Sequence, residues 1–196
     1  VLKAGADGKL QPNDPSLLWA RRAAAQMLAA TGQYQQLLKA ENLLASSAKD
    51  GALPAEDRLR MAEILAPRPE PISRIRAKNL LEAVKQDQRL SLQHDLMLGQ
   101  LYFAVGDWEK CKSQMLSTVS RYKTSPDARI QYINMLLQRG DERDMNMAVR
   151  QMAELRKLAP NDIRTVQLMS ELGAKTGQEE NVRKYLLGLL PKSAAG

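Results

Sequence analysis

The sequence has 196 residues, a formal net charge of +7 and aromatic side chains at only 4% of its positions. Leu, Ala, Gln, Lys, Arg and Glu dominate the chain while strand-forming residues are sparse, so the composition predicts an all-α protein. The single cysteine excludes an internal disulfide, and no apolar run approaches the ~18–20 residues that are needed to cross a bilayer.

The start of the chain differs in character from the rest. Residues 1–15 are polar and rich in glycine, so they predict a linker rather than a packed element. Because the chain begins with Val1 and not with Met, we expect a segment or a processed product of a larger protein. On this basis a soluble protein is expected, with a cytoplasmic location slightly favoured over a periplasmic one.

Helical hairpins follow in chain order. The first has its turn at Gly32, and the second is weaker and has the proline-rich loop 67–71. The third has its turn at Gly106 and also carries Gly99 inside its first helix, where glycine costs roughly 1 kcal/mol against alanine. We therefore expect another helix to pass close to Gly99. The remaining turns fall at Gly140 and Gly177.

The hairpins recur with a regular period, because their starts are predicted near residues 18, 55, 92, 126 and 163. This repeat resembles the tetratricopeptide family, whose period is ~34 residues. The best copy reads Leu98-Gly99-x2-Tyr102, and the fourth copy contains Ala148-x3-Met152. The resemblance implies that residues 16–190 form an α–α superhelix, a solenoid of about five antiparallel hairpins of a bacterial type, with 191–196 as a short tail. A compact helical bundle is the alternative, and the regular period favours the solenoid.

Catalytic chemistry finds little support in the sequence. His94 is the only histidine, and Cys111 occupies a small-residue core position, so we expect both to be structural. One His and one Cys cannot form a zinc site of the usual type, and no glycine-rich phosphate loop is present. The sequence thus predicts a non-enzyme that needs no cofactor or metal.

The family resemblance implies a binding surface. In tetratricopeptide arrays the first helix of each hairpin lines a concave groove, in which a peptide or a partner helix binds. The positions that correspond to this groove are Trp19, Arg22, Gln26, Gln93, Leu96, Gln100, Phe103, Ile130, Asn134, Arg164, Gln167 and Glu171. Some family members hold a partner's C-terminal carboxylate with Lys and Asn; Asn134 matches the Asn, whereas Ile130 stands where the Lys would be. A non-catalytic scaffold for protein partners is the function that this resemblance implies.

The sequence contains two further candidate binding surfaces, one basic and one apolar. An RNA-binding helical-repeat protein would use the most basic helix, which carries Arg74, Arg76, Lys78, Lys85 and Arg89. Aromatic side chains do not alternate with these charges, although RNA-binding platforms need them for stacking, so a nucleic acid is the less favoured partner. The last helix is apolar enough for self-association through Val182, Tyr185, Leu186 and Leu189.

Overall fold

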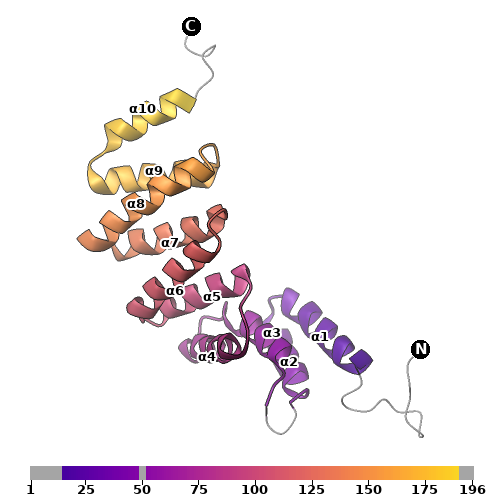
Figure 1. Cartoon of the computed structure of the whole chain (residues 1–196). Coiled ribbons are helices and arrows are strands. Elements are labelled where there is room, and N and C mark those ends of the chain that lie inside the picture. Colours follow the sequence, from indigo (N-terminus) through magenta and orange to yellow (C-terminus); the bar gives the residue numbers. More distant parts are fainter. Residues whose placement is uncertain (1–14, 49–51, 190–196) are drawn as a thin grey trace, which may run out of the picture. The chain divides into compact units, whose positions relative to one another are not determined.

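The computed structural model describes residues 15–48 and 52–189, which contain ten α-helices and no β-strand (Figure 1). The predicted all-α, helical-repeat fold class is confirmed. The expected linker 1–15, apart from Pro15, and the expected tail 191–196 lie outside the described residues. The chain divides into two compact units, 1–111 and 112–196.

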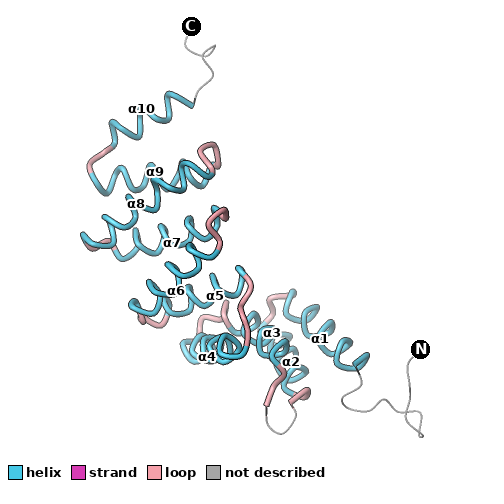
Figure 2. The backbone as a smooth tube through the Cα atoms, in the orientation of Figure 1, coloured by secondary structure: helices cyan, strands magenta, loops and turns pink. Residues whose placement is uncertain are grey.

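The first unit is built from consecutive helices that pack on their neighbours in sequence. Helix α1 packs on α2, α3 on α4 and α4 on α5, with smaller contacts from α3 to α1 and α2. Figure 2 shows the short loops between these helices. Their bounds are α1 Pro15–Ala30, α2 Tyr34–Ala45, α3 Ala55–Leu65, α4 Pro71–Asp87 and α5 Leu92–Ala104.

The second unit repeats this arrangement. The division between the units falls inside α6, after Cys111. Helix α7 packs on α8, and α9 contacts α7, α8 and α10. The bounds are α6 Trp108–Arg121, α7 Pro126–Arg139, α8 Glu142–Leu158, α9 Ile163–Thr176 and α10 Glu179–Leu189. We call α1, α3, α5, α7 and α9 the first helices, and α2, α4, α6, α8 and α10 the second helices.

Glycine forms the turn after four of the first helices in the described part of the chain. Gly32, Gly106, Gly140 and Gly177 have φ angles of 67°, 80°, 72° and 68°. Residues with a side chain rarely adopt this left-handed conformation, so the recurring glycine explains why these helices end where they do. The second hairpin uses the loop between α3 and α4 instead, and there Pro71 occupies the first turn of α4.

The core consists of the apolar stripes that the sequence pattern predicts. Leu98, Leu101 and Tyr102 are buried, as is Cys111, whose side chain is 0% exposed. Gly99 is buried as well. A close approach at a helical glycine is found in the last hairpin, where a Cβ atom at Gly173 would meet the side chain of Val182 in α10.

Candidate partner-binding surfaces

On the first helix of the array, the three predicted groove residues differ in their surroundings. The Trp19 side chain is 71% exposed and Gln26 is exposed as well. Arg22 instead binds two carboxylates of α3: its Nε donates to Asp57 and its Nη1 to Glu56. Asp57 is 0% exposed, so Arg22 compensates a buried charge and links α1 to α3.

Helix α5 carries four of the predicted groove residues. Gln93 and Gln100 are exposed, whereas Leu96 and Phe103 are half-buried. The ring of Phe103 lies edge-on to that of Trp108, with centroids 5.9 Å apart and planes at 76°. Such a contact stabilises by roughly 0.5–1.5 kcal/mol, so the single phenylalanine contributes to packing between consecutive helices.

His94 joins α5 to α3. Its Nε2 lies 2.9 Å from Glu63 Oε1, and its Nδ1 lies 2.9 Å from Ser91 Oγ. The hydrogen bond to His94, helped by Arg60, lowers the pKa of Glu63 despite partial burial. Both imidazole nitrogens are therefore engaged in structural contacts, as the sequence predicts for this residue.

In the second unit, the predicted groove residues lie on α7 and α9. Arg164 of α9 binds Asp127 of α7 at 2.7 Å and also Asp162, which brings the two first helices together. Asn134 is half-buried and Gln167 is exposed, while Glu171 is exposed and lies 4.0 Å from Lys175. Ile130 is only 8% exposed, so this predicted groove position belongs to the core.

A hollow of about 270 Å³ lies on the first-helix side of unit one. Gln26, one of the predicted groove residues, lines it. The wall on α3 carries Arg60 and Glu63, which pair with each other at 3.2 Å. The rest of the lining is largely apolar: Ala25, Ala29, Ala30, Leu44 and Ile64.

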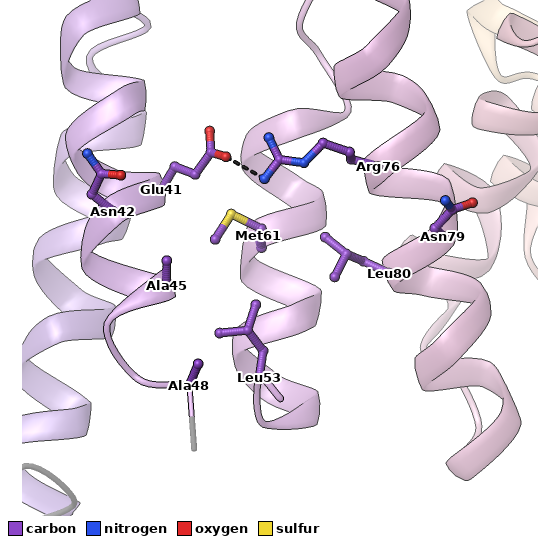
Figure 3. Close-up of a pocket in the computed structure, with 9 residues that line it drawn as sticks. All are labelled: Glu41, Asn42, Ala45, Ala48, Leu53, Met61, Arg76, Asn79 and Leu80. Atoms are coloured by element: carbon purple, nitrogen blue, oxygen red, sulfur yellow. Dashed lines mark ion pairs between the residues drawn. The ribbon is translucent and has the colours of Figure 1, made fainter. Parts of the chain in front are cut away.

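A larger hollow of about 520 Å³ lies between the second helices α2 and α4 (Figure 3). Glu41 of α2 faces Arg76 of α4 across it, and these side chains form an ion pair at 2.6 Å. Leu80 of α4 points toward α3, and the side chain of Met61 on α3 is directed toward α2. Sequence reasoning missed this hollow because its walls come from helices about 35 residues apart and carry no shared motif.

The basic helix of the RNA-binding alternative is α4, and the structure shows its charges engaged. Arg76 pairs with Glu41, Lys78 pairs with Glu82 at 3.2 Å, and Arg74 Nε donates to the carbonyl oxygen of Arg68. Lys85 is exposed, and Arg89, which the sequence placed on the same helix, is exposed as well but lies beyond the end of α4. Because Arg76 and Lys78 are already paired with carboxylates of the chain, less of this positive charge is available for phosphates.

The apolar residues of α10 face the chain itself. The side chain of Val182 lies against Gly173, and Tyr185 donates its hydroxyl to the carbonyl oxygen of Pro160 at 2.7 Å. Leu186 is half-buried, and the Leu189 side chain lies outside the described part of the chain. Leu187, at 54% exposure, is the large apolar side chain that α10 presents outward. Self-association through this helix stays a prediction.

Within residues 15–48 and 52–189, no group of three or more His, Cys, Asp or Glu side chains is placed to hold a metal ion. The helices described there are also too short or too polar to cross a membrane.

Comparison with known proteins connects the chain to one group of solved structures. No protein-family model and no curated protein matches the sequence. A structure titled MamA AMB-1 superposes with a TM-score of 0.67 at 16% identity, covering 93% of this chain and 98% of that one. A MamA MSR-1 structure gives 0.63 at 16% identity, with 86% and 91% covered, and a further MamA crystal structure gives 0.67 at 13%, with 87% and 88% covered. MamA is a tetratricopeptide-like helical-repeat protein, and at these identities the likeness concerns the fold.

Proposed function

We propose that this protein is a non-catalytic scaffold that binds a peptide or a partner helix on its first helices. The observation that carries the proposal is the helical-repeat fold, which the chain shares over nearly its whole length with MamA. Helical repeats expose long rows of side chains on successive first helices, and such rows suit the recognition of extended or helical segments. Gln93, Gln100 and Gln167 are exposed in these rows and take part in no core packing.

The chemistry of the described residues supports binding rather than catalysis. His94 is tied to Glu63 and Ser91, and Cys111 is fully buried, so the two residues with the most versatile chemistry serve the fold. The RNA-binding alternative is less favoured, because three cations of α4 are engaged within the chain.

The proposal is tested by photo-cross-linking at defined positions of the full chain. A photoreactive amino acid replaces Gln100 on the first helix α5, and in a matched control it replaces Gln86 on the second helix α4. Both glutamines are exposed and both belong to unit one. After irradiation in a lysate, mass spectrometry identifies the attached proteins.

We expect a discrete partner attached through position 100 and absent from position 86. Equal labelling at both positions, or labelling at position 86 alone, would show that the first helices are not the binding surface. A nuclease-treated sample separates direct protein contacts from those that a nucleic acid bridges.

A further inference from the structure

Unit two has a groove on the side formed by its second helices, away from the proposed first-helix site. Two adjoining hollows of about 320 and 600 Å³ share Leu116 and run between α6 and α8. Their floor comes from Arg129 and Tyr132 of the first helix α7. The wall on α8 extends from Arg143 to Leu158, which at 1.5 Å per residue is a length of about 22 Å. We call this surface the α6–α8 groove.

The α6–α8 groove has an excess of positive charge. Six cationic side chains and two carboxylates line it: Lys112, Lys123, Arg129, Arg143, Arg150 and Lys157 against Asp144 and Glu154. Glu154 is matched by Lys157 at 2.7 Å. In the described part of the chain, Lys123, Arg143 and Arg150 form no ion pair. The hollows of unit one differ, since their arginines Arg60 and Arg76 are paired with carboxylates at 3.2 and 2.6 Å.

A buried polar group in the groove lacks a partner. Asp144 is only 4% exposed and lines the groove, yet its Oδ2 accepts no hydrogen bond from the described residues. The backbone N–H of Asp144 is already bound to Asp141, which caps the helix. An unsatisfied buried oxygen costs roughly 1–3 kcal/mol, so a ligand that brings an N–H or O–H donor to this point would remove a penalty.

Apolar side chains lie between the charges. Leu116 of α6 and Leu158 of α8 are 38% and 39% exposed, and Met147 is half-buried beside Arg143 and Arg150. A segment that fits the groove therefore combines carboxylates, apolar side chains and a free backbone N–H. An extended chain has all three, whereas the N–H groups of a helix are used internally beyond its first turn.

We propose that the α6–α8 groove binds an extended acidic segment of a partner protein. Carboxylates of the segment bind Arg143, Arg150 and Lys123, and a backbone N–H donates to Asp144 Oδ2. Apolar side chains of the segment rest on Leu116. At about 3.3 Å per residue, roughly seven residues span the groove. This second surface goes beyond the proposed first-helix site, because it lies on the opposite helices and specifies the charge of its ligand.

A nucleic acid fits these features less well. The one aromatic residue among those that line the groove, Tyr132, is 0% exposed and offers no face for a base to stack on. A protein segment uses the aliphatic surface of Leu116 as well as the cations.

The test measures fluorescence anisotropy of a labelled eight-residue peptide of alternating Asp and Leu with the full chain. The groove variant is R143E/R150E, and its matched control is K39E/K184E, which changes the net charge equally at two exposed lysines on α2 and α10. A third variant, Asp144→Asn, replaces the acceptor oxygen by an amide with nearly the same shape. Octa-uridylate serves as the competing probe, and circular dichroism checks that each variant is helical.

We expect R143E/R150E to weaken peptide binding about tenfold or more, while K39E/K184E stays within about twofold of the parent. Asp144→Asn weakens binding about threefold without loss of helicity. No binding by the parent, or equal losses in both double variants, would overturn the proposal. Tighter binding of octa-uridylate at the same residues would assign the groove to nucleic acid instead. Cross-linking through Gln100 is independent of all these results, so failure here leaves the first-helix proposal separately testable.

Discussion

Gly173 of α9 and Val182 of α10 are in such close contact that a Cβ atom at residue 173 would lie 2.3 Å from a methyl group of Val182. No real Cβ contact is that short, and the β-branched valine has few rotamers into which it can withdraw. The glycine is therefore required for the packing of the last hairpin, although it lies in a helix where alanine is intrinsically better.

Gly173→Ala is expected to lower the free energy of unfolding of unit two by about 1–3 kcal/mol, as overpacked sites do. The double variant G173A/V182A removes the obstructing methyl groups and should recover part of the loss. Urea unfolding followed by circular dichroism measures both. If the double variant lost more free energy of unfolding than the two single variants lose together, this explanation would be contradicted.

Arg22→Ala should destabilise the first unit by about 1–3 kcal/mol, because the carboxylate of Asp57 then remains buried without its cation. Ser47 still donates to Asp57 at 2.6 Å, so part of the compensation is kept. The control is Gln26→Ala on the same helix, where the side chain is exposed and no partner is lost. Thermal unfolding of the two variants should differ clearly, and equal midpoints would argue against a structural role for Arg22.

The surroundings of Tyr102 predict that the folded protein loses stability at high pH. Burial and the 2.7 Å hydrogen bond from its hydroxyl to Glu82 raise the pKa of Tyr102 above that of an unfolded chain, about 10, and the charge of Asp107 acts in the same direction. Lys110 lies over the ring at 5.7 Å. The folded state thus keeps the phenol proton where the unfolded state releases it, so this stabilisation is complete below pH ~10 and declines as pH rises further.

The measurement is urea unfolding at pH 8 and pH 10.5 for the parent and for Tyr102→Phe. The variant should be less stable at pH 8 by about 1 kcal/mol, the contribution of one hydrogen bond, and should lose less on going to pH 10.5. Identical pH dependence in both proteins would show that Tyr102 does not control it.

Asp144→Asn should preserve or raise stability at neutral pH. Burial, together with the hydrogen bond and charge of Asp141, raises the pKa of Asp144, whereas Lys112 and Arg139 oppose the shift. A raised pKa means that the folded state binds this proton more tightly than the unfolded state does, so the resulting stabilisation is present below the unfolded pKa and is lost as pH rises. Unfolding at pH 7 should therefore show no destabilisation by the amide, and the difference from the parent should be smaller at pH 3.

Local signals in the sequence predicted much of the fold. The glycines at 32, 106, 140 and 177 mark turns because their backbone angle excludes most side chains, and this reason acts within a few residues. The burial of Cys111 followed from its place in an apolar stripe. The packing of α10 was harder to predict, because Gly173 and Val182 resemble ordinary helix residues until the hairpin brings them together.

The candidate sites were less predictable. Ile130 matches a family groove position but is buried, and Arg22 is directed to Asp57, 35 residues away. The sequence did not predict the α6–α8 groove. Lys123 and Arg150 are 27 positions apart and, in the sequence, resemble ordinary solvated charges on separate helices. Which cations lack a partner depends on the three-dimensional neighbours of each side chain, and helical periodicity does not contain that information.

The packing of each helix mainly on its neighbours in sequence has a consequence for synthesis. The main contacts within each unit join helices that are made one after another, so a hairpin such as α1–α2 is complete before α4 has been translated. Proteins with such local contacts fold rapidly, and domains fold as units during translation at about 5–20 residues per second. The nascent chain can therefore acquire native structure one hairpin at a time as it leaves the ribosome. Little apolar surface then stays exposed until a distant part of the chain has been made.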